Sequence, residues 1–351
     1  MKQLKNKIKC RVKYWLNDCD THTISVVIAG FFTLMIICGI SLILLVACVQ
    51  IRKSNDMAGK DKAETKDTIH IARYIRPEIP QMMTDPQQRA FYYVNHYWDG
   101  YSLADTAFIR SDDTEQLFSD FIGALQYVDP EESSTALKRM MSRMEEDSTA
   151  YSRFCTLSEK YLYDANSPMR NEDYFIPVLE QMIDSKRLTE YDKIRPIDQL
   201  EQAHKNRPGM TATDFTYVTP KGKAGRMSDI KADYTLLFFY DPDCTNCREY
   251  EHILSEMPAF LEMQEKGLLR VLAVYPDDNE EEWLLKSSQM PRGWIVGWNK
   301  QGDIRSRTLY EIRATPTMYL LDKQKKVMLK DGALDQLVQY LSAVYSQSNE
   351  E

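Results

Sequence analysis

Histidine and paired cysteines, the usual ligands of structural zinc, are scarce in this chain. Its 351 residues include five histidines, and neither a second C-x-x-C nor an H-x-x-x-H accompanies the single C-x-x-C at Cys244 and Cys247. His252 lies close to that motif, but a structural zinc site requires four ligands. We therefore expect no metal site.

Positive charge is also in short supply. The chain has 44 Lys and Arg against 52 Asp and Glu, a net charge of -8, and several of the basic residues belong to an N-terminal tail. Nucleic-acid binding depends on a positive surface that meets the phosphates. The composition therefore disfavours a nucleic-acid partner.

Cysteine is rare outside the N-terminal segment. Of seven cysteines, only Cys155, Cys244 and Cys247 come after residue 48. Three cysteines cannot build the disulfide framework that staples small secreted domains. Cys155 lies within a helical pattern, and we predict that it is an inert, buried thiol.

One long segment lacks charge altogether. Residues Thr23 to Val49 contain no Asp, Glu, Lys or Arg, and a helix of this length exceeds the roughly 30 Å hydrocarbon core of a bilayer. We predict a transmembrane helix or lipoprotein signal at residues 23–51, preceded by a basic cytoplasmic tail at residues 1–22. The basic bias places the later domains on the extracytoplasmic, periplasmic side of the cell membrane.

A second interpretation of this segment stays open. Leu45-Val46-Ala47-Cys48 is similar to a lipobox, in which cleavage is followed by lipidation of Cys48. The apolar region of a signal peptide usually spans about 7–15 residues, which favours the uncleaved helix here. Both interpretations tether the chain to a membrane.

Two further regions lie before the C-x-x-C. Residues 52–67 are polar and charged, which predicts a flexible tether. Residues 68–208 show helical periodicity throughout, with Asp85, Asn171 and Thr189 as expected helix starts, and we predict an all-helical domain. Its Met and aromatic residues recur at core spacing, so packing accounts for them before any client-binding groove does.

The C-x-x-C lies between a strand and a helix. Tyr234 to Tyr240 is an apolar run typical of a buried strand, and apolar residues at helical spacing follow Cys247 as far as Gly267. Leu268 to Tyr275 predicts the next strand. This pattern indicates a βαβ unit with both cysteines at a helix N-terminus, where free N–H groups stabilise a thiolate.

Two further motifs support a family resemblance. Ala212 to Val218 and Met227 to Ile230 match an opening hairpin and a turn, and Ala314 to Asp322 matches a strand that carries a cis-proline at Pro316. From about Gly209 to Val344 the chain resembles the membrane-associated, thioredoxin-like thiol–disulfide oxidoreductases of the cell envelope. The resemblance implies an α/β, thioredoxin-like domain with a mixed sheet at residues 209–346, followed by a disordered tail at residues 347–351.

The chain departs from that family beside the cysteines. Thioredoxins usually carry Trp before the first cysteine, where this chain has Asp243. Many relatives bury a carboxylate six residues before that cysteine, where this chain has Phe238. Glu249 and Glu251 lie near in sequence, and we expect both to face solvent. The route by which the second cysteine loses its proton is therefore open.

These observations predict a thiol–disulfide oxidoreductase, and the family resemblance implies a reductase before an oxidase or isomerase. Cys244 is the expected nucleophile and Cys247 the resolving cysteine. Thr315 and Pro316 are expected to hold the substrate backbone, and Tyr240 and Asp243 to shape its approach. The redox-active disulfide is the only expected cofactor, protein thiols and disulfides are the expected partners, and the resemblance adds a membrane electron donor.

The rival hypothesis is a binding protein. In it the thioredoxin-like domain is a scaffold, the helical domain binds a protein or peptide client, and the cysteines exchange slowly. A fold alone does not establish a function, so this alternative stays open.

Overall fold

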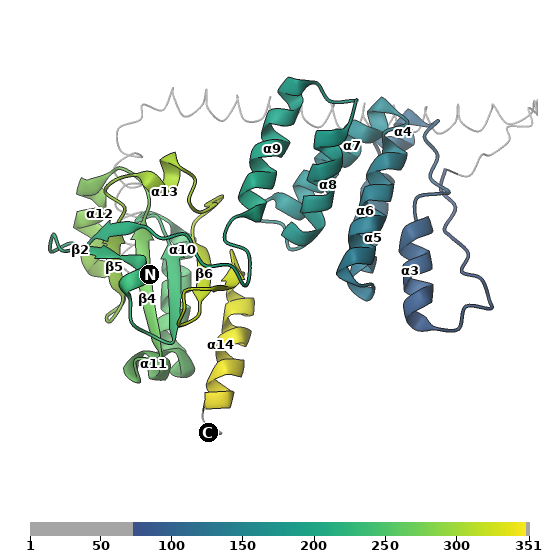
Figure 1. Cartoon of the computed structure of the whole chain (residues 1–351). Helices are drawn as coiled ribbons and strands as arrows, with labels where there is room; N and C mark the ends of the chain where they lie inside the picture. The colour runs from purple at the N-terminus through teal and green to yellow at the C-terminus, as the bar shows by residue number, and fades with distance from the viewer. Residues whose placement is uncertain (1–72, 349–351) are drawn as a thin grey trace, which may run out of the picture. The chain divides into compact units, whose positions relative to one another are not determined.

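The computed structural model describes residues 73–348, which belong to one compact unit (Figure 1). We call residues 73–208 the helical part and residues 209–348 the α/β part. The predicted membrane segment at 23–51, the tether at 52–67 and the lipidation candidate Cys48 lie outside the described residues. No helix within residues 73–348 has the length and apolar character needed to cross a bilayer.

The helical part consists of seven α-helices and two shorter turns within the described residues. They are α3 (Pro86–His96), α4 (Thr106–Ile109), α5 (Asp112–Ala124), a 3-10 turn (Leu125–Tyr127), α6 (Pro130–Met144), α7 (Ser148–Ser158), a π-helix (Glu159–Tyr163), α8 (Glu172–Asp184) and α9 (Glu190–His204). The short helix α4 and the π-helix were not expected from the sequence.

Side-chain caps explain where three of these helices begin. Asp85 accepts hydrogen bonds from two backbone N–H groups of α3, Asn171 accepts one from Tyr174, and Thr189 accepts one from Asp192. Each cap satisfies a donor that has no partner within the helix. The three helix starts predicted from the sequence are therefore confirmed.

The core of the helical part is rich in aromatic and Met side chains. Trp98 contacts Phe121 and Phe154 edge-on, with ring centroids 5.6 and 4.9 Å away. Met140 and Met144 on α6 are buried in the same cluster. Packing therefore accounts for these residues. Cys155 packs against this core, and burial raises the pKa of its thiol to about 12, which keeps it unreactive.

The α/β part is built on a seven-stranded mixed sheet. Its strands are β1 (Thr216–Val218), β2 (Ala224–Arg226), β3 (Tyr234–Phe239), β4 (Leu269–Tyr275), β5 (Ile295–Trp298), β6 (Thr317–Leu321) and β7 (Val327–Lys330). Their order in the sheet is β2-β1-β5-β4-β3-β6-β7. The central strands β3, β4 and β5 run parallel, and β6 pairs antiparallel with β3. The predicted mixed sheet and its βαβ unit are confirmed.

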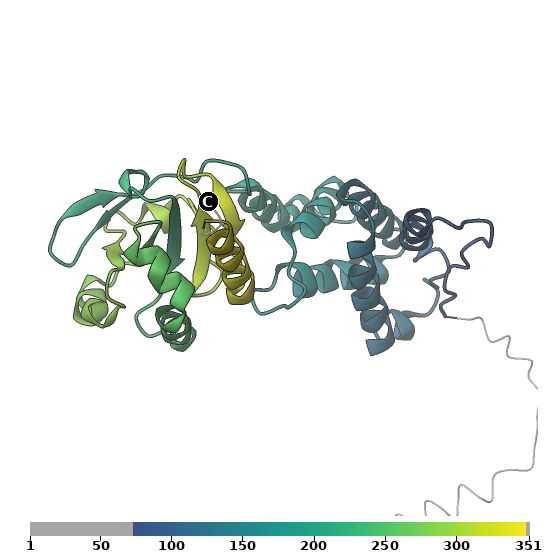
Figure 2. The ribbon, with the colours of Figure 1, turned by 90° about the horizontal axis from the view of Figure 1, so that it is seen from below.

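Both faces of the central strand β3 are buried. Leu236 and Phe238 face a layer formed by α10 (Thr245–Glu256), α11 (Pro258–Glu265) and α14 (Leu334–Ser348). Leu237 and Phe239 face the opposite cluster, to which the short helix α13 (Asp303–Ser306) contributes. Figure 2 shows α14, in yellow, beside the green helices of its layer. Burial on both faces explains the continuous apolar run in the sequence.

The helix after the cysteines is broken, contrary to the single helix expected as far as Gly267. It ends at Glu256, and α11 begins at Pro258. Met257 between them is extended, with φ -78° and ψ 114°, because a residue before proline avoids the helical conformation. Ile253 and Leu261, which lie on either side of this break, are 39% and 41% exposed.

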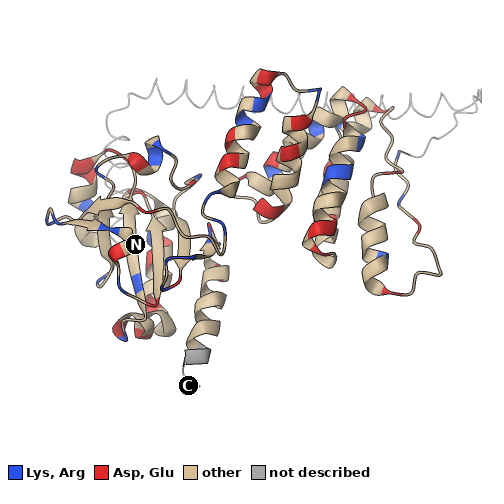
Figure 3. Ribbon diagram, in the orientation of Figure 1, with Lys and Arg blue, Asp and Glu red and all other residues tan. Residues whose placement is uncertain are grey.

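Charged residues of both signs are spread along the helices (Figure 3). α14 carries little charge, since Asp335 is its single charged residue. The helix runs to Ser348 and so takes in the first two residues of the predicted disordered tail 347–351. Its apolar residues Leu337 and Leu341 are fully buried against the sheet, which accounts for the stability of this terminal helix.

Candidate active site

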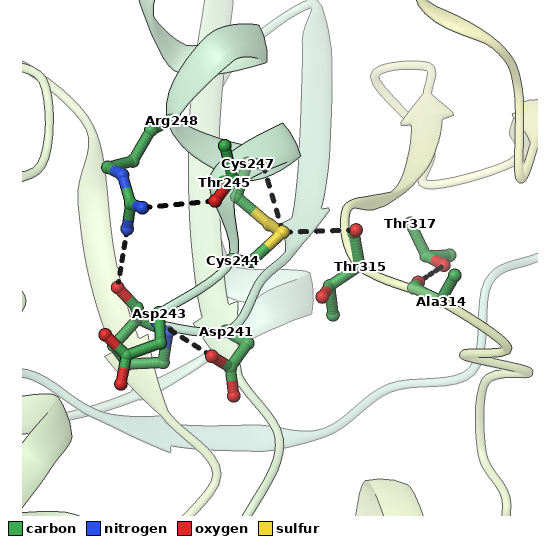
Figure 4. The surroundings of a disulfide bond; sticks show 10 residues. Asp241, Asp243, Cys244, Thr245, Cys247, Arg248, Ala314, Thr315 and Thr317 are labelled. Carbon is green, nitrogen blue, oxygen red and sulfur yellow. Dashed lines mark hydrogen bonds between the residues drawn. A yellow bond between two sulfur atoms is a disulfide. The ribbon is translucent and has the colours of Figure 1, made fainter. Parts of the chain in front are cut away.

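The two cysteines form a disulfide at the start of α10 (Figure 4). Cys244 is the N-cap residue of the helix, and the Cα atoms of the pair are 5.2 Å apart. The backbone N–H of Cys247 donates to Cys244 Sγ over 3.0 Å. When the disulfide is reduced, this donor and the positive end of the helix dipole stabilise a thiolate at Cys244.

The two sulfurs differ in their access to solvent. Cys247 is 1% exposed and packs against the sheet, whereas Cys244 is only partly buried. An incoming disulfide can therefore reach Cys244 first. This asymmetry suits a nucleophile followed by a resolving cysteine.

A cis peptide bond between Thr315 and Pro316 lies opposite the cysteines. Cys244 Sγ is 3.2 Å from the carbonyl oxygen of Thr315 (Figure 4). The loop is closed by the Thr317 hydroxyl, which donates to the carbonyl of Ala314 over 2.7 Å. The structure thus brings together two motifs that lie about seventy residues apart, and it places the free backbone edge of the loop beside the reactive sulfur.

The aspartates before Cys244 are held by local contacts. Asp241 Oδ1 accepts a hydrogen bond from the backbone N–H of Asp243 over 2.8 Å. The side chain of Asp243 is 67% exposed and forms an ion pair with Lys286. Hydrogen bonding to Glu282 and Lys286 lowers the pKa of Asp243, so it is ionised. Because Lys286 pairs with it, much of its charge is compensated before it can act on the thiol.

Tyr240 lies beneath this loop rather than on the surface. It is 3% exposed, and among residues 73–348 its hydroxyl has no partner at hydrogen-bond geometry. Burial raises its pKa well above the ordinary range. Together with Arg248, Glu251 and Trp294, Tyr240 lines a cavity of about 490 Å³ that also borders Asp241 and Pro242 of the loop before Cys244. The role of Tyr240 in shaping the substrate's approach stays a prediction.

Glu251 is a functional candidate that the sequence analysis missed. Glu249 is exposed as expected, but Glu251 is half-buried at the cavity beside Tyr240. Burial raises the pKa of Glu251 to about 7, against a smaller opposing effect of Arg248. The expectation that Glu251 faces solvent is therefore wrong. A carboxyl four residues after Cys247 shares its helix face, and that spacing was the available indication.

Within residues 73–348, no group of three or more His, Cys, Asp or Glu is arranged to hold an ion. His252 lies beside the exposed Glu256 and is itself exposed, with 70% of its side chain accessible.

Known structures resemble the chain over both of its parts. A thioredoxin-like protein from Bacteroides caccae, solved by crystallography, is 39% identical, and the match covers 77% of this chain and 98% of that one with a TM-score of 0.73. The chain belongs to the thioredoxin-like proteins. Because this coverage exceeds either part alone, a single superposition includes both the helical and the α/β part of this thioredoxin-like protein.

Two other solved structures match a portion of the chain. A conserved protein of unknown function from Bacteroides fragilis is 64% identical over 38% of this chain and 98% of that one, with a TM-score of 0.38. A domain of a "possible thiol-disulfide isomerase" from Cytophaga hutchinsonii is 25% identical over 42% of this chain and 99% of that one, with a TM-score of 0.36. No curated protein matches.

The helical part corresponds to a known domain family. The model of DUF5106, a domain of unknown function, matches residues 49–206. The match ends at the last turn before the α/β part begins. A domain without an assigned role therefore precedes the thioredoxin-like domain in this protein.

Proposed function

We propose that this protein is a thiol–disulfide oxidoreductase that reduces disulfides in other proteins. The observation that carries the proposal is the position of Cys244 Sγ at a helix N-terminus, 3.2 Å from the Thr315 carbonyl of the cis-proline loop. A substrate strand that pairs with this loop would bring its disulfide to the sulfur.

The reaction follows from the two sulfurs. The Cys244 thiolate attacks one sulfur of the substrate disulfide, forms a mixed disulfide and releases the first substrate thiolate. Cys247 then loses its proton and attacks Cys244 Sγ, which closes the disulfide seen in the structure and releases the second thiolate. The substrate gains two electrons and the cysteine pair loses two. A dithiol donor must return them, and we propose a membrane-bound one.

Glu251 supplies the proton acceptor in this proposal. It lies one helical turn after Cys247 and half-buried beside the cavity. Its pKa of about 7 allows it to change protonation near neutral pH, as a general base requires. It would thereby take the place of the acid that Phe238 excludes from strand β3.

The proposed direction rests on the charge near Cys244. Asp243 stands where thioredoxins usually carry Trp, and the negative charge of Asp241, with the part of the Asp243 charge that Lys286 leaves uncompensated, makes the Cys244 thiolate less stable. A less stable reduced form is the stronger reductant, so the expected potential lies below about -220 mV, nearer to thioredoxin than to oxidising family members. Equilibration with glutathione redox buffers measures it, and a value above about -150 mV would indicate an oxidase.

The location is part of the same proposal. The uncharged segment Thr23–Val49 supports a membrane tether, with the described domains outside the cytoplasm. Intact mass of the membrane-extracted protein distinguishes the two anchors. An unmodified chain supports the helix, and a mature chain that starts at a lipid-modified Cys48 supports the lipoprotein.

Covalent trapping tests the activity. The Cys247→Ser variant of the full chain cannot resolve its mixed disulfides, so partners should stay bound at Cys244 and be released by dithiothreitol. Cys155→Ser in the same background is the control, because Cys155 is partly buried against the helical core with a raised thiol pKa and should not affect trapping. The absence of both discrete partners and insulin reduction by the wild-type protein would contradict the oxidoreductase function and favour the binding-scaffold alternative.

A further inference from the structure

A cluster of six charged side chains joins the helical part to the α/β part. Each of these side chains has 6–24% of its surface exposed. Arg170 and Glu172 come from the helical part, and Glu311, Arg313, Lys330 and Asp331 come from the α/β part. Three positive and three negative charges balance. Buried charges are tolerated only when they are paired, so each half of the cluster depends on the other.

Tyr163, the last residue of the π-helix, contacts the α/β part through its hydroxyl, its backbone carbonyl and its ring. Its hydroxyl donates to Glu311 Oε1 over 2.8 Å. Its backbone carbonyl accepts from Arg313 Nη1 over 2.5 Å, and the Arg313 guanidinium lies 4.6 Å from the centre of its ring. One tyrosine thus binds two residues of the segment that leads into the cis-proline loop.

Arg313 is held on its other side by the end of strand β7. Its Nη2 donates to Asp331 Oδ2 over 2.6 Å. Arg170 of the helical part binds the same residue, with its Nη2 donating to the Asp331 carbonyl over 2.5 Å and its Nη1 3.4 Å from Oδ2. Arg313 therefore sits between two groups that the helical part positions.

A second attachment fixes strand β7 itself. Lys330 Nζ is 2.9 Å from Glu172 Oε2 and donates to the backbone carbonyls of Gln202, Ala203 and Lys205 at 2.7–3.1 Å. These carbonyls belong to the C-terminal end of α9, where a positive charge is favourable. Strand β7 pairs with β6, the strand that follows the cis-proline.

These contacts reach the redox site through a very short stretch of backbone. Arg313 precedes Thr315 by two residues, and the Thr315 carbonyl is the group 3.2 Å from Cys244 Sγ. We propose that the helical part is a positioning domain, which holds the substrate-binding loop at Thr315 and Pro316 in place through Tyr163, Arg170 and the Arg313 side chain. This assigns a role to the domain of unknown function, and it rests on the function proposed above.

A pair of matched tyrosine variants tests the proposal in the full chain. Tyr163→Phe removes the hydroxyl that binds Glu311, whereas Tyr161→Phe removes a hydroxyl that donates to Glu115 over 3.0 Å within the helical part. Both changes delete one tyrosine–glutamate hydrogen bond on the same turn. Arg170→Gln is a second, independent test of the attachment to Asp331.

Two measurements separate positioning from activity. Hydrogen–deuterium exchange over residues 311–318 reports the order of the loop, and steady-state kinetics with a peptide disulfide reports substrate binding. For Tyr163→Phe and Arg170→Gln we expect faster exchange in this segment and a KM raised about three- to tenfold, the factor that one hydrogen bond contributes, with kcat within about twofold. Alkylation of Cys244 by iodoacetamide, which needs no loop backbone, should change less than about twofold.

The outcomes are distinct. Unchanged loop exchange in both Tyr163→Phe and Arg170→Gln overturns the positioning role, and so does an equal effect of Tyr161→Phe, which would indicate general destabilisation. Faster loop exchange in a protein whose wild type reduces no disulfide supports the positioning role and rejects the oxidoreductase function. The two proposals therefore fail separately.

Discussion

Glu251 should make the stability of this protein depend on pH in a direction opposite to that of most carboxylates. Its pKa of about 7 in the folded chain exceeds the ordinary value of 4.5. Between these pH values the unfolded chain loses the proton and the folded chain keeps it. Its favourable contribution is therefore complete below about pH 4.5 and is lost as the pH rises through 7.

The size of the effect follows from the same two values. Each tenfold change in the acid dissociation constant corresponds to about 1.4 kcal/mol, so ionising this carboxyl in the folded protein costs roughly 3 kcal/mol more than in the unfolded chain. Glu251 is only half-buried, so screening by water reduces the expected cost to about 1–2 kcal/mol. Glu251→Gln keeps the shape of the side chain and cannot ionise, and it should remove this cost.

Urea denaturation of the oxidised protein at several pH values measures the effect. The difference in unfolding free energy between Glu251→Gln and the wild type should be near zero at pH 4.5 and about 1–2 kcal/mol in favour of the variant at pH 8. Glu249→Gln, on the exposed neighbour, is the matched control and should show no such trend. A difference that stays constant between pH 4.5 and 8 would refute the reasoning.

Three further predictions concern the site and its support. Glu251→Gln should slow resolution of the mixed disulfide by roughly tenfold or more at pH 7, as measured by stopped-flow fluorescence. The pH at which the resolution rate rises should also be higher in this variant. Lys286→Met leaves the charge of Asp243 uncompensated, so alkylation of the nucleophilic cysteine at pH 7 should slow by about two- to threefold; a faster reaction would contradict the charge argument. Leu254→Ala, at a fully buried position of α10, should reduce the unfolding free energy by about 2–4 kcal/mol, against less than about 1 kcal/mol for Ile253→Ala at the exposed neighbour, measured by urea denaturation.

Local patterns in the sequence predict much of this fold, because the features concerned arise within a few residues. The apolar run at Tyr234 to Tyr240 becomes a strand buried on both faces, and Asp85, Asn171 and Thr189 start helices through caps that are themselves local. The break at Pro258 could also have been recognised, since proline restricts the residue before it. The apolar residues before and after Met257 keep helical spacing, and this spacing concealed the break.

The features missed depend on contacts between distant residues. Glu251 is half-buried because its helix packs beside Trp294 and Tyr240, which come from other elements. The attachment of the cis-proline loop joins Tyr163 to Arg313 across 150 residues. From a single sequence, charged residues are expected to be exposed to solvent. Only tertiary packing shows which of them are buried and paired.

The chain itself occupies the outer edge of strand β7, which restricts how a substrate can bind. The backbone N–H of Gly209 donates to the Val327 carbonyl over 2.7 Å, Val327 donates to the Met210 carbonyl over 2.8 Å, and Ala212 donates to the Lys325 carbonyl over 2.8 Å. A substrate strand cannot add where these bonds exist. The free backbone beside Cys244 is instead that of the cis-proline loop, whose approach segment is attached to the helical part. Residues 209–212 thus close this edge of the sheet, whereas separate contacts of Tyr163 with Glu311 and Arg313 attach the segment that leads to the loop beside Cys244.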